Sequence, residues 1–108
     1  MTVYVDDYAG KLGRMKMCHM LATSPAELFA MAAAIGMRRE WFQPQSYPHF
    51  DVAKGRRADA IRQGAVEIGA RDLVRLRRAE WGLESETHRL WAEFFRNNPE
   101  LARGKHEL

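Results

Sequence analysis

Residues 2–7 read Thr-Val-Tyr-Val-Asp-Asp, and this run sets the fold class. Two valines alternate around a tyrosine, which is typical of a short β-strand, and the aspartates that follow disfavour strand and begin a loop. The first strand therefore ends in two carboxylates, Asp6 and Asp7. The apolar run at residues 17–21 predicts a second, buried strand, and residues 65–68 predict a third.

A helix begins at residue 25, where the sequence carries several start signals together. Ser24 supplies an N-cap hydroxyl, Pro25 fits the first helical position, and Glu27 completes a capping box. Gly36 favours the left-handed conformation that ends many helices. Further helices are predicted over residues 52–63, 70–80 and 85–97, the first of them capped by Asp51.

The resulting prediction is one α/β domain with a small, mostly parallel three-stranded sheet and three to four helices. A length of 108 residues suits a single hydrophobic core. We expect residues 1–80 to form that α/β core. Residues 81–108 follow a break at Gly82 and are predicted to be a helical appendage, packed on the core or on a partner subunit in a homodimer.

Composition excludes several classes of protein. Cys18 is the one cysteine, so neither an intrachain disulfide nor an all-cysteine zinc site can form. This favours a reducing, cytoplasmic setting. The N-terminus lacks the basic and apolar regions of a signal peptide, and no apolar run is long enough to span a membrane, so no membrane association is expected.

Positive charge is concentrated in the middle of the chain. Residues 54–78 hold eight basic and three acidic side chains, whereas the whole chain carries a net charge of only +3. Such a stretch attracts phosphate groups or nucleic acid. A phosphorylated small molecule or a nucleic acid is therefore the expected partner.

The polar residues suited to chemistry gather at predicted strand ends and in the aromatic loop over residues 38–50. A histidine beside a carboxylate can act as a general base, and the same residue types can hold a divalent metal, the candidate cofactor. Basic residues follow directly at a helix start, where anions bind well. The candidate catalytic residues are Asp6, His19, His49 and Asp51, and the candidate ligand-binding residues are Asp7, Trp41, Gln43, Lys54, Arg56 and Arg57.

Each of these residues also has an ordinary structural interpretation. Asp51 is a good N-cap, and His19 sits in an apolar run that suits a hydrogen-bonded core histidine. Cys18 is expected to be a small buried core residue rather than a nucleophile. Trp41 suits core or lid packing. The catalytic hypothesis therefore requires Asp6, His19, His49 and Asp51 to meet in the fold.

Five segments together resemble a family of small bacterial and phage proteins known as domain of unknown function 4031. They are V-Y-V-D-D at 3–7, G-R-M-K-M-C-H-M at 13–20, R-R-E-W-F-Q at 38–43, H-F-D at 49–51 and G-A-V-E-I at 64–68. The resemblance covers residues 2–76 and implies an intracellular protein, but no activity. Many members have His-Tyr-Asp where this chain has His49-Phe50-Asp51, so a role for that tyrosine hydroxyl does not transfer.

Two functional hypotheses follow. The first is an enzyme-like domain that binds a phosphorylated ligand, a nucleotide or a nucleic-acid end, with acid-base or metal chemistry at the His and Asp residues. The second is a non-catalytic phage accessory factor that binds nucleic acid or a host protein through its basic helices. The second would lose affinity steeply with added salt.

Overall fold

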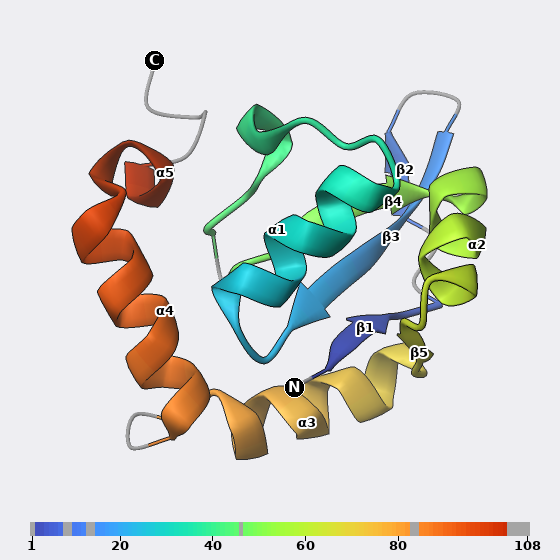
Figure 1. Ribbon diagram of the computed structural model, residues 1–108. Coiled ribbons are helices and arrows are strands. Elements are labelled where there is room, and N and C mark those ends of the chain that lie inside the picture. Colours follow the sequence, from blue (N-terminus) through green and yellow to red (C-terminus); the bar gives the residue numbers. More distant parts are fainter. Residues whose placement is uncertain (1, 8–9, 13–14, 46, 83–84, 104–108) are drawn as a thin grey trace.

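The computed structural model is an α/β fold with one sheet (Figure 1). It describes residues 2–7, 10–12, 15–45, 47–82 and 85–103. Residues 83–84 and 104–108 of the predicted appendage, and residues 13–14 of the family motif, lie outside these residues. The five strands among them are β1 (Val3–Val5), β2 (Gly10–Leu12), β3 (Met15–Ala22), β4 (Phe50–Ala53) and β5 (Val66–Glu67).

Strand β3 is the centre of the sheet. β1 and β2 pair with it antiparallel along one edge, β4 pairs antiparallel along the other, and β5 adds to β1 in parallel. The prediction of a mostly parallel, three-stranded sheet is therefore wrong. β1, β2 and β3 are joined by connections of a few residues, too short for the crossover of about a dozen residues that parallel neighbours require.

The helices are α1 (Pro25–Ala34), the short 3-10 helix η1 (Arg39–Trp41), α2 (Lys54–Arg62), α3 (Ala70–Glu80), α4 (Glu86–Asn97) and α5 (Pro99–Arg103). The predicted start of α1 is confirmed, because Ser24 Oγ accepts a hydrogen bond from Glu27 N. The helix ends shortly before Gly36, which has φ +80° and so adopts the left-handed conformation predicted for it. Residues 70–80 are helical as predicted. The helix predicted over residues 85–97 ends at Asn97, as predicted, and Pro99 begins α5.

The predicted helix over residues 52–63 is wrong at its start. Residues 50–53 form β4 and the helix begins at Lys54, after an N-cap, Ala53, that makes no side-chain cap bond. Asp51 is therefore a strand residue and caps nothing. Phe50 and Val52 are fully buried while Asp51 is partly exposed, which is the two-residue alternation of a strand.

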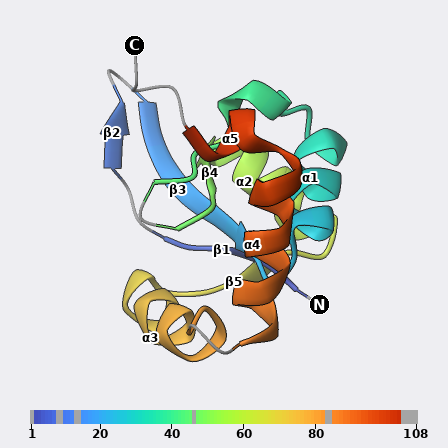
Figure 2. The same cartoon turned by 90° about the vertical axis from the view of Figure 1, so that its left-hand side faces the viewer.

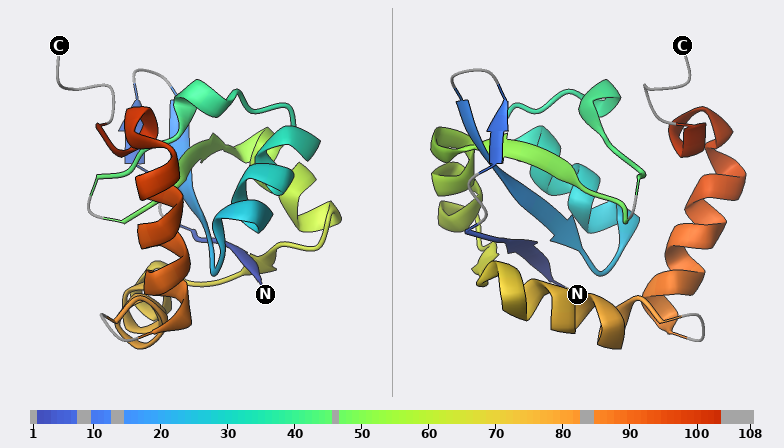
Figure 3. Two further views of the ribbon diagram at one scale, coloured as in Figure 1. Left: turned by 60° about the vertical axis from the view of Figure 1, so that its left-hand side comes forward. Right: turned by 180° about the vertical axis from the view of Figure 1, so that it is seen from behind.

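The two faces of the sheet differ in character. One face carries the apolar core, including Val5, Met20, Phe50 and Val52, with α1 packed against it (Figures 1 and 2). In the right-hand panel of Figure 3 the opposite face of β3 and β4 is turned to the viewer and α1 lies behind. Residues that alternate with the core positions point toward this second face.

The C-terminal segment packs on the same core. Trp91 of α4 is 3% exposed and stacks parallel on Phe42, with ring centroids 5.7 Å apart. Its indole Nε1 donates to the Ala22 carbonyl at 3.3 Å. The predicted homodimer contact stays a prediction. Among the described helices, none is long and apolar enough to cross a membrane.

Candidate metal centre

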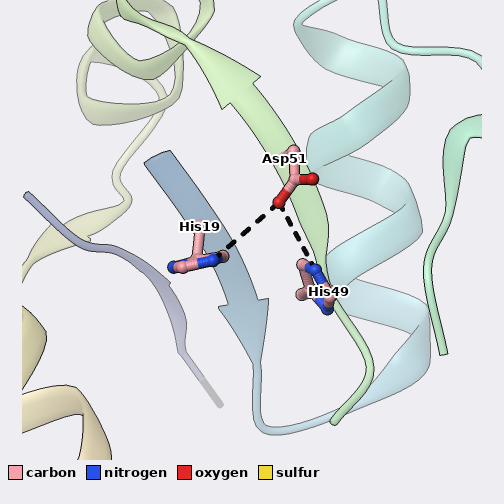
Figure 4. Close-up of side chains that lie close together, drawn as sticks. All are labelled: His19, His49 and Asp51. Atoms are coloured by element: carbon pink, nitrogen blue, oxygen red, sulfur yellow. Dashed lines mark ion pairs between the residues drawn. The ribbon is translucent and has the colours of Figure 1, made fainter. Parts of the chain in front are cut away.

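A row of polar side chains crosses the second face of the sheet. His19 of β3 and Asp51 of β4 are directly opposed partners in the ladder. Asp6 follows β1, and its main-chain N–H bonds to the His19 carbonyl at 3.0 Å, so it extends the row on the other side. His49 precedes Asp51 by two residues and points the same way. Figure 4 shows His19, His49 and Asp51 gathered on this face.

The distances in this group are short. Asp51 Oδ1 lies 3.4 Å from His49 Nε2 and 4.0 Å from His19 Nε2 (Figure 4). One ligand atom from each of the three residues lies within 4.8 Å of the others. The side chain of His49 is 10% exposed and those of His19 and Asp51 are 23% and 29% exposed. A small ligand can therefore reach the group from solvent.

The opposite nitrogen of each imidazole is held by a hydrogen-bond acceptor. His19 Nδ1 lies 2.7 Å from Oδ2 of Asp6, a carboxylate that is 1% exposed. His49 Nδ1 lies 2.8 Å from the main-chain carbonyl of Tyr47. Because an ionised carboxylate and a carbonyl only accept hydrogen bonds, Nδ1 carries the proton in both rings. Both rings therefore present Nε2 toward Asp51.

Asp51 is held in the same manner. Its Oδ2 accepts a hydrogen bond of 2.6 Å from Gln43 Nε2, which leaves Oδ1 to face the imidazoles. Gln43 is placed by a β-bridge in which its main chain exchanges two hydrogen bonds with that of His49. Three ligand-type atoms thus converge, each backed by a fixed polar partner, as is common around protein metal sites.

The convergence has an electrostatic consequence. Two imidazole nitrogens and one carboxylate oxygen point toward a common space, so positive charge there, as imidazolium protons or as a bound cation, stabilises the group. The hydrogen bond with Asp6 raises the pKa of His19 above its ordinary value. The hydrogen bond with His49 lowers the pKa of Asp51. Both shifts favour a charged, paired group.

The fold brings together five of the predicted site residues: Asp6, His19, Gln43, His49 and Asp51. Asp7 is placed elsewhere, since its Oδ1 accepts from Ala70 N at 2.8 Å at the start of α3. Gln43, predicted as a ligand-binding residue, donates a hydrogen bond to Asp51 Oδ2 and thereby orients that carboxylate.

The predicted basic residues of α2 are not gathered at this group. Arg56 Nη1 donates to the Ile35 carbonyl at the end of α1, and its guanidinium lies over Trp41. Arg57 Nε donates to the Asp6 carbonyl, and its Nη2 lies 3.2 Å from Glu67. Arg56 therefore ties α2 to α1, and Arg57 ties α2 to the sheet. Lys54 is exposed at the start of α2.

Sequence reasoning missed two residues beside the group. The Tyr47 ring lies 5.1 Å from the His49 ring and 6.1 Å from the His19 ring, centroid to centroid. The Arg77 guanidinium lies 3.6 Å from the centre of the Tyr47 ring. Tyr47 belongs to the predicted aromatic loop and Arg77 to the basic stretch over residues 54–78, but no spacing in the sequence connects these two segments. The contact arises from tertiary packing.

Comparison with known proteins identifies the family and no more. The model of the family described as protein of unknown function (DUF4031) matches residues 3–80, so the chain belongs to this family. This confirms the resemblance. No curated protein and no solved structure matches the chain.

Proposed function

We propose that this member of a family without assigned activity binds one divalent transition-metal ion through His19 Nε2, His49 Nε2 and Asp51 Oδ1. The ion would take part in binding and hydrolysing a phosphate ester. The observation that carries the proposal is the convergence of these three atoms while the remaining polar atom of each side chain is occupied.

The spacing suits a metal ion. Ligand atoms about 2.1 Å from a tetrahedral ion are separated by about 3.4 Å. The pair His49 Nε2 and Asp51 Oδ1 already has that separation, 3.4 Å. His19 Nε2, at 4.0 Å from the same oxygen, has to move closer by about 0.6 Å. A side-chain rotation provides such a shift without any change in the sheet.

The donor set indicates which ions to expect. Two imidazoles and one carboxylate suit zinc, iron, cobalt and nickel, whereas magnesium and calcium prefer oxygen alone. Cys18 is next to His19 in the sequence but is buried in the core on the other face of the sheet, so no thiolate joins the set. Zinc or iron(II) is the expected resident ion.

Three protein ligands leave a coordination position for water or for a ligand oxygen, as in catalytic metal sites. An ion there would lower the pKa of bound water and polarise a phosphoryl oxygen. Arg77 supplies a second positive charge beside the group, because its guanidinium lies against Tyr47, the neighbour of both histidines. The two charges favour a phosphorylated ligand.

Isothermal titration of the chelator-treated protein with zinc chloride tests the proposal. We expect one ion per chain. A His49→Ala variant should bind zinc more than about 100-fold more weakly, because removing a metal ligand lowers the affinity more than removing a residue that is hydrogen-bonded to a ligand. His88→Ala is the matched control, a histidine of α4 that is not one of the three ligands. Failure of the unaltered chain to bind, or equal binding by His49→Ala, would overturn the proposal.

A second candidate function is the non-catalytic binding of nucleic acid. The exposed arginines of α3 favour this function. Arg71, Arg75 and Arg78 are exposed on this helix, although Arg75 lies 3.4 Å from Asp72. Binding to a DNA duplex should then weaken steeply with salt. It should also be abolished by replacing Arg75 and Arg78 with alanine and unaffected by His49→Ala. The opposite pattern would exclude this candidate.

A further inference from the structure

A groove lies beside the candidate metal centre, between α3, α4 and the loop over residues 44–48. Its volume is about 590 Å³, within the range of about 300 to 1,000 Å³ that is usual for small-molecule sites. Its lining includes Tyr47, Arg77, Trp81, His88, Trp91 and Phe95.

The lining combines aromatic walls with basic groups. Trp81 and Phe95 contribute partly exposed aromatic rings, and Arg77, Arg78 and His88 contribute positive or protonatable groups. No carboxylate lines the groove within the described part of the chain. Flat aromatic rings stack on nucleobases, and arginine pairs with phosphate. The chemistry of the groove therefore matches a planar ligand that carries negative charge.

Tyr47 connects the groove with the metal centre. It belongs to the groove lining, and its ring also contacts the rings of His49 and His19, with centroids 5.1 and 6.1 Å apart. Arg77 lies over the Tyr47 ring and lines the groove as well. An anion held by Arg77 would thus lie at the end of the groove nearest the metal centre.

A buried donor in the lining gives an independent indication of a ligand. The indole Nε1 of Trp81 is buried and has no hydrogen-bond acceptor among the described residues. Leaving a buried donor without an acceptor destabilises a protein. Because this atom is closed to water, a nucleobase in the groove can reach it only when a lining side chain moves, and the carbonyl and ring-nitrogen acceptors at the edge of the base would then satisfy it.

We propose that the groove binds a nucleoside phosphate, with the base between the aromatic walls and the phosphate at Arg77, facing the metal centre. This inference rests on the proposed function and names its substrate class. The same chemistry is offered by a free nucleotide and by the phosphorylated end of a nucleic-acid strand.

Isothermal titration of the zinc-loaded protein with adenosine monophosphate, adenosine and inorganic phosphate tests the inference. The nucleotide should bind at least tenfold more tightly than either fragment, because only the nucleotide fills both parts of the site. Arg77→Ala should lose at least tenfold in nucleotide affinity. Arg75→Ala, an exposed arginine of the same helix, is the matched control and should bind as the unaltered chain does.

Trp81→Phe provides a second variant, which keeps an aromatic ring and removes only the N–H donor. It should weaken nucleotide binding severalfold and leave phosphate binding unchanged, which a general loss of folding would not do. Equal affinity for nucleotide and phosphate, or full nucleotide affinity in both variants, would overturn the inference.

Two further titrations distinguish a free nucleotide from a strand end, and the nucleotide site from the metal site. A 5′-phosphorylated dinucleotide that binds more tightly than the mononucleotide identifies a strand end as the source, and weaker binding identifies the free nucleotide. Titration with zinc alone reports on the proposed function separately. If zinc binds but nucleotide binds no better than phosphate, the inference fails and the metal site stands. If nucleotide binds and zinc does not, the proposed function fails.

Discussion

Asp6 holds His19 with both oxygens of its carboxylate. Oδ2 lies 2.7 Å from the imidazole Nδ1, and Oδ1 accepts the main-chain N–H of the same histidine at 2.8 Å. Asp6 is 1% exposed, so its carboxylate is shielded from water. The end of β1 thereby fixes both the position of the ring on β3 and the nitrogen that it presents to Asp51.

The first prediction concerns this pair. Asp6→Asn keeps the shape of the side chain but removes its charge and one acceptor, so the imidazole of His19 loses its orienting partner. We expect zinc affinity to fall by about 10 to 100-fold and stability to fall by about 1 to 3 kcal/mol. Titration calorimetry and urea unfolding measure the two effects.

Asp7→Asn is the matched control for that prediction. Asp7 is exposed and bonds to the start of α3, away from the histidines. Its zinc affinity should equal that of the unaltered chain. If Asp6→Asn also binds zinc normally, Asp6 is only a structural residue and does not orient a metal ligand.

The second prediction concerns the C-terminal helix. Trp91→Ala removes a ring that is 3% exposed and stacked on Phe42, and large-to-small changes of this kind cost about 3 to 5 kcal/mol. Urea unfolding measures the loss, with the exposed Arg96→Ala as control. A loss below about 1 kcal/mol would show that α4 contributes little to the core.

The third prediction compares two glycines. Gly36 has φ +80°, and a Cβ there would lie 2.9 Å from Arg56 Nη1, so Gly36→Ala should destabilise by about 1 to 2 kcal/mol. Gly55 lies within α2 and has no atom within 4 Å of such a Cβ, so Gly55→Ala should stabilise by about 0.5 to 1 kcal/mol. Thermal unfolding of both variants measures the contrast, and shifts of equal sign would contradict it.

The fourth prediction concerns Cys18, which is 5% exposed. Burial raises the pKa of its thiol, so at mildly alkaline pH less of the reactive thiolate is present than in an ordinary cysteine. We expect a thiol reagent such as dithionitrobenzoate to react at least tenfold more slowly with the folded chain than with the chain in guanidinium chloride. Comparable rates would show that the thiol is accessible.

Local signals allowed part of the fold to be predicted. The cap at Ser24, the proline after it and Gly36 act within one helix, so the sequence near α1 is enough to place it. The same holds for Ser85, whose hydroxyl accepts from His88 N as the cap of α4. Strand directions were not predictable, because pairing depends on contacts between distant segments.

The candidate site was predicted in part for the same reason. A histidine and an aspartate two residues apart share a side in an extended segment, and the contact between His49 and Asp51 agrees with that expectation. The grouping with Asp6 and His19 could be stated only as a requirement of the hypothesis. Aspartate is both a good helix cap and a metal ligand, and that ambiguity led to the wrong cap assignment of Asp51. Tyr47 and Arg77 meet only through the packing of α3.

Titration of the metal-free protein with cobalt(II), followed by visible absorption, tests the proposed metal site, because the absorption of bound cobalt depends on its coordination. We expect a ligand-field spectrum that saturates at one ion per chain and disappears in Asp51→Asn, which lacks the charged oxygen. Absorption without saturation in the unaltered chain, or an unchanged spectrum in Asp51→Asn, would show that His19, His49 and Asp51 hold no metal.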